Sequence, residues 1–238
     1  MKNSRNVILF DLDSTLLQVN QDLFLHEYFK LVDKYAKTLD FDSTGFLDLF
    51  LYSAYNIINN DGSESNYERF WKQIDLKYGK DLRKYLEDSF EIFYQKEFDK
   101  LESLINKTDT PNNIIKELKS KGYKLFLATN PLYPRIATLK RVSWAGLDYK
   151  DFIDITTYEN SKFCKPKREY YYELLKKHNL KEEDCIMVGN DLDDDFIDLP
   201  KNIEKVLITD YLINKNNKEI TMPKFTLNEY LEYIKSNY

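Results

Sequence analysis

Cysteine is scarce in this 238-residue chain: its two cysteines, Cys164 and Cys185, are far apart and belong to no partner motif. This usage is untypical of a disulfide-stabilised secreted protein, and we expect a reducing, cytoplasmic location. Apolar runs are short as well, and none approaches the roughly 18 residues that a membrane-spanning helix needs. The nearest run, residues 46–58, contains polar residues, and the N-terminal run is too soon interrupted by aspartates for a signal peptide.

Blocks of basic residues and low-complexity linkers are also missing. Lys and Arg number 35 against 40 Asp and Glu, which gives a net charge of −5. This balance argues against a nucleic-acid polymer as partner. The 42% hydrophobic and 32% charged residues suit a globular protein. We therefore expect a small-molecule ligand, no membrane association, and a monomer or small homo-oligomer.

What is present is an alternation of short apolar runs and helical segments. The runs that are typical of strands buried on both faces are 6–10, 124–128, 152–155, 185–188 and 205–208. Thr110 and Pro111 predict a helix start, with Thr110 as the N-cap, and Gly122 predicts its end. Another helix is expected over about 166–177. This alternation predicts an α/β fold with a Rossmann-like parallel sheet core and helices on both faces.

Residues 18–105 break this alternation, because the stretch contains no convincing strand. One amphipathic helix is indicated by four residues with helical spacing: Phe24, Tyr28, Leu31 and Tyr35. A possible capping box begins a second helix at Ser65, and a third is expected over 81–104. We therefore predict an all-helical cap domain, 18–105, inserted into a core domain formed by residues 1–17 and 106–238.

Polar side chains follow three of the expected strands, at the point where each strand ends. In chain order they are Asp11 and Asp13, then Thr129 and Asn130, then Asn190 and Asp191. In open parallel sheets, ligands bind in the crevice beyond the carboxyl ends of the strands. The sequence therefore predicts a candidate site where carboxylates, a hydroxyl and an amide converge.

These positions resemble the four ordered motifs of the haloacid dehalogenase (HAD) superfamily of hydrolases. The matching segments are Asp11-Leu12-Asp13-Ser14-Thr15, Thr129, Lys165-Pro166 and Gly189-Asn190-Asp191-Leu192-Asp193-Asp194-Asp195. A D-x-D-x-T match alone is common by chance, whereas four motifs in the right order are specific. The resemblance implies a phosphatase-like branch of the superfamily with a helical cap inserted after the first strand.

For this chain the resemblance implies a nucleophilic mechanism. Asp11 would attack phosphorus to give an aspartyl-phosphate, and Asp13 would act first as general acid and then as base. Lys165 would provide positive charge to Asp11 and to the transferring phosphoryl group, and Thr129 a hydroxyl donor. Asn130 is a further substrate-binding candidate beside Thr129 and Lys165.

The resemblance also implies Mg²⁺ as cofactor, bound by the carboxylate of Asp11, the backbone carbonyl of Asp13 and Asp191. The fourth motif is ambiguous, because the chain has Gly-Asn-Asp where Gly-Asp is the commonest form. Either Asn190 or Asp191 can occupy the metal position. Asp191 is preferred, because an ionised carboxylate binds a hard cation better than an amide does.

The remaining motif residues are expected to play supporting roles. Asn190 and Asp195 are predicted to lie beside the metal ligands, with Asp195 orienting Lys165 or a metal-bound water. Asp193 and Asp194 are assigned to solvent. Position 14 is Ser where the family usually has Gly, a mild change if the backbone there keeps an ordinary conformation.

The expected activity is Mg²⁺-dependent hydrolysis of a small phosphorylated metabolite. The alternatives are a metal-independent haloacid dehalogenase, a phosphomutase, and a non-catalytic binding protein that keeps the fold. A dehalogenase needs neither metal nor the second aspartate, so Asp13 and Asp191 argue against it. The presence of Asp11, Thr129 and Lys165 together argues against a protein that has lost catalysis.

Overall fold

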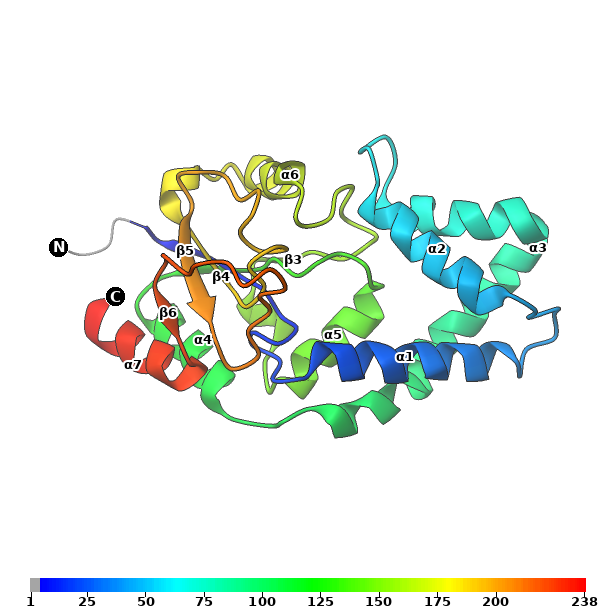
Figure 1. The fold of residues 1–238 in the computed structure, drawn as a ribbon, viewed down its shortest axis with the longest axis horizontal. Helices are drawn as coiled ribbons and strands as arrows, with labels where there is room; N and C mark the ends of the chain where they lie inside the picture. Colours follow the sequence, from blue (N-terminus) through cyan, green and yellow to red (C-terminus); the bar gives the residue numbers. More distant parts are fainter. Residues whose placement is uncertain (1–4) are drawn as a thin grey trace.

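The computed structural model describes residues 5–238 and is built on a six-stranded sheet in which every neighbouring pair is parallel (Figure 1). The strands are β1 (Val7–Phe10), β2 (Lys124–Leu127), β3 (Asp154–Ile155), β4 (Cys185–Gly189), β5 (Glu204–Ile208) and β6 (Lys224–Phe225). Their order is β3-β2-β1-β4-β5-β6, so β1 lies in the middle between β2 and β4. The predicted parallel sheet is confirmed, and the two-residue strand β6 is an addition that its short sequence did not reveal.

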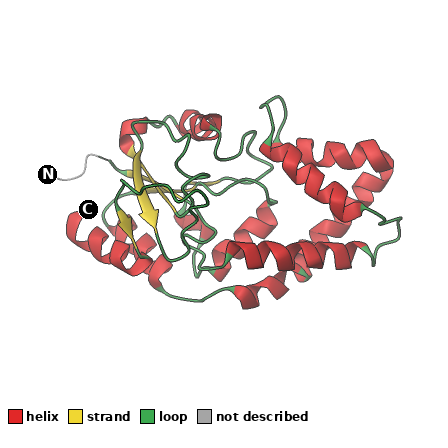
Figure 2. Cartoon of the chain, viewed as in Figure 1, coloured by secondary structure: helices red, strands yellow, loops and turns green. Residues whose placement is uncertain are grey.

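Helices cover both faces of this sheet (Figure 2). The core helices are α4 (Thr110–Ser120), α5 (Arg135–Trp144), α6 (Arg168–His178) and α7 (Leu227–Asn237), with short 3₁₀ turns η2 (Tyr149–Asp151) and η3 (Glu182–Asp184). Side chains alternate along β1, because successive residues of a strand point to opposite faces. Ile8 and Phe10 join the hydrophobic cluster of α4, α5 and α7, whereas Val7 and Leu9 join that of α6.

Two helix starts differ from the sequence prediction. Helix α4 already includes Thr110, and the preceding Asp109 makes no side-chain capping bond, so Thr110 is not the N-cap. Helix α6 begins at Arg168, because Lys167 still has an extended backbone (ψ 131°). The helix of residues 110–120 ends before Gly122, whose φ of 85° stops it as predicted.

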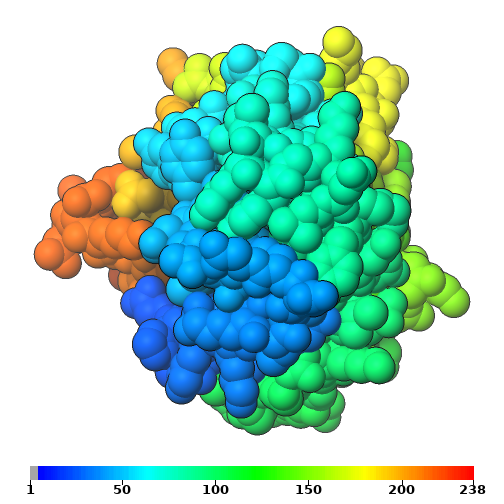
Figure 3. All heavy atoms as spheres, turned by 90° about the vertical axis from the view of Figure 1, so that its right-hand side faces the viewer, coloured from blue at the N-terminus to red at the C-terminus, as the bar shows by residue number. Residues whose placement is uncertain are grey.

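Between β1 and β2 the chain forms a helical insertion. Its elements are α1 (Gln21–Ala36), α2 (Phe46–Ile58), α3 (Asn66–Lys96) and the 3₁₀ helix η1 (Phe98–Leu104). Figure 3 shows α2 and α3 covering one end of the molecule. The connections to the core are adjacent, because the N–H of Asn106 donates to the carbonyl of Gln18 at 2.9 Å. Domain limits at 17/18 and 105/106 stay a prediction.

The helices of the insertion follow from local sequence signals. In α1, Phe24 and Tyr28 are buried on the predicted face, and Leu31 and Tyr35 are partly buried against the same core. Val32 is also fully buried beside them. The capping box is confirmed, since Ser65 Oγ accepts from the N–H of Glu68 while the Glu68 carboxylate accepts from the N–H of Ser65. The second and third expected helices are both present and meet in α3, where the backbone of Gly79 (φ 79°) is not helical. The third is shorter than expected, because it ends at Lys96 and η1 follows. None of the helices in residues 5–238 combines the length and apolarity needed to cross a membrane.

Candidate active site

The carboxyl ends of β1, β2 and β4 bring the predicted polar residues to one edge of the sheet. The N–H of Asp11 donates to the carbonyl of Val188 at 2.9 Å, and the N–H of Ala128 donates to the carbonyl of Phe10 at 2.7 Å. These bonds continue the parallel pairing one residue beyond the strands. Asp11, Thr129 and Asn190 therefore follow three neighbouring strands at nearly the same level.

Asp11 lies almost buried between a cation and a hydroxyl. Its Oδ1 accepts from Lys165 Nζ at 2.7 Å, and its Oδ2 accepts from Thr15 Oγ1 at 3.2 Å. Burial raises the pKa of Asp11 to about 7 against the lowering effect of Lys165, and the carboxylates of Asp195 and Asp13 add to the rise. Additional positive charge at this edge would therefore favour the ionised, nucleophilic form.

Lys165 precedes α6 and is only 2% exposed. Its ammonium group donates to Asp11 at 2.7 Å and to Asp195 Oδ1 at 2.6 Å. Burial by itself lowers the pKa of Lys165, but the two carboxylates outweigh burial and raise the pKa well above its usual value. Lys165 is therefore a fixed positive charge held between two aspartates.

Asp195 contacts both Lys165 and the turn after β4. Its Oδ2 accepts the N–H groups of Asn190 and Asp191, each at 3.0 Å. A Cβ at Gly189 would lie 2.2 Å from this oxygen, so only glycine allows the close approach. The glycine and the distant aspartate of the fourth motif thus form one structural unit.

Asn190 and Asp191 differ in how much of their side chain is already engaged. The Asn190 amide accepts from Thr15 Oγ1 at 3.0 Å and donates to the carbonyl of Tyr211 at 2.8 Å. The Asp191 carboxylate accepts two backbone N–H groups, both at Oδ1, and its partial burial raises its pKa. Among residues 5–238, Asp191 therefore has the freer oxygen, Oδ2, and is the better placed of the two to bind a cation.

Asp13 has a partner that the sequence did not indicate. Its Oδ2 forms an ion pair with Arg141 of α5, a residue with no exposed surface. The Arg141 guanidinium also lies over the ring of Tyr133, 4.1 Å from its centre, and donates to Thr138 Oγ1 at 3.3 Å. The other oxygen of Asp13, Oδ1, is buried without a hydrogen-bond partner within residues 5–238.

Arg141 lies outside all four motifs, in the middle of a helix. The only sequence signal for its position is helical phase: Arg141 lies one turn after Ala137 and Thr138, on the same face of the helix. In the structure all three residues are buried. Buried arginines are rare unless they are paired. However, the sequence does not show that Arg141 is buried, so its contact with Asp13 could not be foreseen.

Thr129 and Asn130 follow β2 as expected. The carbonyl oxygen of Thr129 accepts from Thr156 Oγ1 at 2.6 Å and from the Tyr170 hydroxyl at 3.0 Å. Asn130 Nδ2 donates to Asp194 Oδ2 at 3.3 Å, and Asn130 Oδ1 is buried without a partner in the described residues. These bonds fix the backbone that carries the Thr129 hydroxyl.

One expectation at this edge is wrong, and the condition stated for Ser14 is not met. Asp194 is not in solvent: the turn after β4 directs it toward Asn130, and burial raises its pKa. Asp193 is half-buried as well, but it points elsewhere and pairs with Lys218. Ser14 does not have an ordinary backbone, because its φ is 62°, in the left-handed region; its hydroxyl donates to the carbonyl of Val19 at 2.7 Å.

We call this group of carboxylates the acidic edge: Asp11, Asp13, Asp191, Asp194 and Asp195. Within residues 5–238, the salt bridges that these aspartates form are to Lys165 and Arg141 alone. Negative charge is therefore in excess, and every candidate ligand is an oxygen, which suits a hard cation such as Mg²⁺. The described residues hold no cluster of three His, Cys, Asp or Glu side chains arranged for a metal, but the expected set requires only two carboxylates and a backbone carbonyl.

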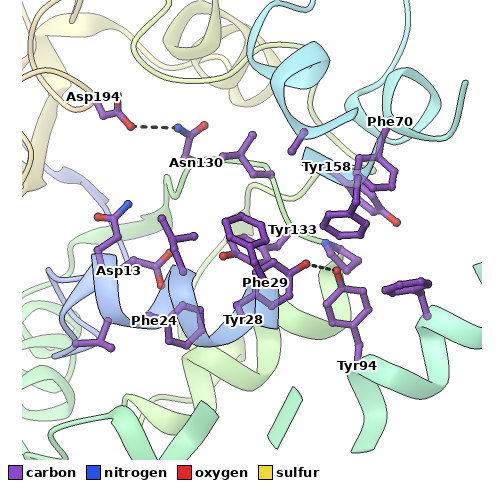
Figure 4. A pocket seen from close by; sticks show the side chains of 18 of the residues that line it. Asp13, Phe24, Tyr28, Phe29, Phe70, Tyr94, Asn130, Tyr133, Tyr158 and Asp194 are labelled. Atoms are coloured by element: carbon purple, nitrogen blue, oxygen red, sulfur yellow. Dashed lines mark hydrogen bonds between the residues drawn. The ribbon is translucent and has the colours of Figure 1, made fainter. Parts of the chain in front are cut away.

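A cavity of about 150 Å³ opens beside the acidic edge, between the insertion and the loop after β2 (Figure 4). The aromatic residues of its wall are Phe24, Tyr28, Phe29, Phe50, Phe70, Trp71, Phe90, Tyr94, Tyr133 and Tyr158. Asp13, Asn130 and Asp194 lie at one end of it, as Figure 4 shows. We call it the aromatic cavity. A second, more open and more polar depression contains Asp191, Asp194 and Lys215.

Residues 6–196 match the sequence model of the haloacid dehalogenase-like hydrolases. The chain belongs to this family. It is also 26% identical to glyceraldehyde 3-phosphate phosphatase of Methanothermobacter thermautotrophicus over 193 residues, which are 80% of this chain and 79% of the relative.

Solved structures of this hydrolase family share the fold. A predicted phosphoglycolate phosphatase from Haemophilus somnus 129pt matches with a TM-score of 0.57 and 19% identity, over 96% of this chain and 97% of the other. The HAD-hydrolase YfnB from Bacillus subtilis, described as bound to magnesium, matches with a TM-score of 0.52 and 19% identity, over 97% and 98%. At these identities the likeness establishes the fold alone.

Proposed function

We propose that this hydrolase is a cytoplasmic, Mg²⁺-dependent phosphatase that acts on a small phosphorylated metabolite through an aspartyl-phosphate. The observation that carries the proposal is Asp11, held by Lys165 at 2.7 Å, with Asp13 two residues further on. The relatives named above include a phosphatase of a small phosphorylated aldehyde and a magnesium-bound structure, which support it. Both cysteines are free and buried, consistent with a reducing compartment.

Asp11 is the proposed nucleophile. Lys165 holds Oδ1, which leaves Oδ2, released from its weak 3.2 Å bond to Thr15, to attack phosphorus. The bond between Oδ2 and phosphorus forms as the bond between phosphorus and the leaving oxygen breaks. Lys165 and the Thr129 hydroxyl offset charge on the phosphoryl oxygens, which is where such contacts accelerate phosphoryl transfer.

Asp13 is the proposed proton carrier. Arg141 holds its Oδ2, so Oδ1, which has no partner in residues 5–238, is the atom that can carry the proton. In the first step Oδ1–H gives this proton to the leaving oxygen, and an alcohol departs. In the second step Oδ1 takes a proton from water, which attacks the aspartyl-phosphate and releases inorganic phosphate and the Asp11 carboxylate.

The acidic edge fits Mg²⁺, with Asp11, the carbonyl of Asp13 and Asp191 as proposed ligands. When bound, the ion would offset the repulsion between the carboxylates and an anionic phosphate. Asp195 is the proposed positioning residue of Lys165, which it contacts at 2.6 Å, and Asn190 positions Thr15. Dehalogenation has less support, because that reaction needs neither the acid–base role proposed for Asp13 nor the metal-binding role proposed for Asp191.

The proposal is tested by assaying phosphate release from a panel of small phosphate esters that includes glyceraldehyde 3-phosphate. We expect activity that requires added Mg²⁺ and that disappears in Asp11→Asn, which removes the nucleophile and keeps the side-chain volume. Asp198→Asn is the matched control, because Asp198 is exposed and close in sequence to the fourth motif. Hydrolysis that persists in Asp11→Asn, or that EDTA does not affect, would contradict the mechanism.

A further inference from the structure

The aromatic cavity has a mainly apolar wall, and several of its polar atoms are hydrogen-bonded to one another. The hydroxyls of Tyr28 and Tyr94 are hydrogen-bonded at 2.7 Å, and Trp71 Nε1 donates to the Tyr158 hydroxyl at 3.4 Å. These rings come from α1, α3 and the loop after β3, so the insertion and the core both contribute. A ligand in this part of the cavity meets mainly ring faces and edges.

Charged groups are confined to one end of the aromatic cavity. Asp13 and Asp194 are the only charged residues of its wall among residues 5–238, and both belong to the acidic edge. No lysine, arginine or histidine among the described residues lines it. Apart from Asn130, Gln21 and the tyrosine hydroxyls, the rest of the wall is apolar, so a carboxylate or a polyhydroxylated chain placed here would lose most of its hydrogen bonds to water, which costs free energy.

The position of Asp13 connects this cavity to the chemistry. Its carboxylate lines the cavity, and its Oδ1 has no hydrogen-bond partner in the described residues. Under the proposed mechanism, that oxygen protonates the leaving oxygen of the substrate. The organic part of the substrate would therefore start at Asp13 and extend between the aromatic rings, toward Phe70 and Tyr94 (Figure 4).

We propose that the aromatic cavity receives the leaving group of the substrate, and that this group is a single uncharged aromatic ring. The inference rests on the proposed phosphatase function and narrows its substrate class to aryl and arylmethyl phosphate monoesters. The size agrees, since an apolar cavity of about 150 Å³ holds one benzene molecule, and this cavity has that volume. Ring-on-ring contacts add to the preference for an aromatic ligand.

The test compares benzyl phosphate with glycerol 1-phosphate, because both leave as primary alcohols and so differ little in intrinsic reactivity. We expect kcat/KM for benzyl phosphate to be about 10- to 100-fold higher, the range that apolar pockets give for modest differences in fit. Most of the difference should appear in KM. Acetyl phosphate serves as a substrate whose leaving group is too small to fill the cavity.

Ala54→Leu tests whether the cavity causes this preference. Ala54 lines the cavity from α2, and leucine would occupy the space of the ring. We expect the ratio of kcat/KM for benzyl phosphate to that for glycerol 1-phosphate to fall at least 10-fold. Tyr55→Leu is the matched control on the same helix, because Tyr55 is 61% exposed and does not line the cavity. It should keep the ratio.

A second variant enlarges the cavity, whereas Ala54→Leu fills it. Phe70→Leu shortens a wall residue, so 2-naphthylmethyl phosphate should gain relative to benzyl phosphate. Circular dichroism and thermal melting of each variant would show that the fold is retained, and the preference of the unmodified protein is measured independently of any variant.

The outcomes separate the two proposals. If glycerol 1-phosphate or glyceraldehyde 3-phosphate is hydrolysed as well as benzyl phosphate, the inference is wrong while the phosphatase function stands. If benzyl phosphate is preferred but Ala54→Leu leaves the ratio intact, the cavity is not its cause and the inference is wrong. If no ester, acetyl phosphate included, is hydrolysed in an Asp11-dependent way, the proposed function fails and the inference fails with it.

Discussion

The acidic edge and the aromatic cavity meet at Asp13, yet they are built on opposite principles. At the acidic edge, residues from distant parts of the chain are fixed by charged hydrogen bonds, such as those of Lys165 to Asp11 and Asp195. In the cavity, rings are fixed by packing, as in the contact of Phe50 with Phe70 at 5.1 Å. The difference suggests that the proposed chemistry depends on exact charge placement, and the proposed selectivity on volume.

Lys165→Met should break the acidic edge most completely. Removing the ammonium leaves Asp11 and Asp195 facing each other unpaired, so kcat should fall by about 10²–10³ for benzyl and glycerol 1-phosphate alike. The loss of one partner of a buried ion pair should also lower the free energy of unfolding by about 3–5 kcal/mol. Steady-state kinetics and urea unfolding measure the two effects. Lys162→Met, at an exposed position, is the control.

Arg141→Met addresses the residue that joins the two regions. Without its ion pair, the Asp13 carboxylate is no longer held at one end of the aromatic cavity. We expect kcat to fall by about 10²-fold, because proton transfer requires a correctly positioned carboxyl group. Arg141→Lys should recover little, since lysine lacks the planar group that lies over Tyr133. Arg135→Met, exposed on the same helix, controls for a lost charge. A change in KM alone would contradict the assignment.

Gly189→Ala should have a smaller effect on the acidic edge. The added methyl group would force Asp195 away from a position 2.2 Å from the new carbon. Overpacking of this kind costs about 1–3 kcal/mol, and the displaced Asp195 should reduce kcat through Lys165. The ratio between benzyl and glycerol 1-phosphate should not change, because the cavity is untouched. Thermal unfolding and the kinetic ratio give both readouts.

Ser14→Gly and Ser14→Ala should produce the smallest effects, on stability alone. Glycine removes the strain of the left-handed backbone at residue 14, which should stabilise the folded state by about 1 kcal/mol. It also loses the hydrogen bond from the serine hydroxyl to the carbonyl of Val19. Alanine loses the bond and keeps the strain. We therefore expect Ser14→Ala to be less stable than Ser14→Gly by about 1 kcal/mol in urea unfolding. Equal stabilities would show that the backbone at residue 14 is not strained.

The parts of the fold that were predicted from sequence are those encoded locally. The runs before Asp11, Thr129 and Asn190 are apolar enough to identify buried strands, and parallel pairing then brings their ends together. Ser65 and Glu68 identify a helix start by their spacing alone. Periodicity in the same way indicates α1, whereas α2 was not among the helices expected for the insertion.

The features that were not predicted depend on contacts between distant segments. Arg141 meets Asp13 only because the fold brings α5 close to the residues that follow β1, and no spacing rule relates residues 13 and 141. Asp194 differs from Asp193 only in the direction that the turn gives it. The aromatic cavity likewise requires α1, α2 and α3 to be placed around it, whereas periodicity shows merely that each helix has a buried face.

The hydrogen bond between Gln18 and Asn106 has a consequence for how this chain folds. Because the two ends of the insertion lie side by side, the inserted residues form a closed loop on the core, whatever their number. The entropy of closing a loop grows only logarithmically with its length, by about 0.6 kcal/mol for each doubling. A core with this junction can therefore tolerate insertions of very different size and shape, and can acquire a new cavity without rebuilding its strands.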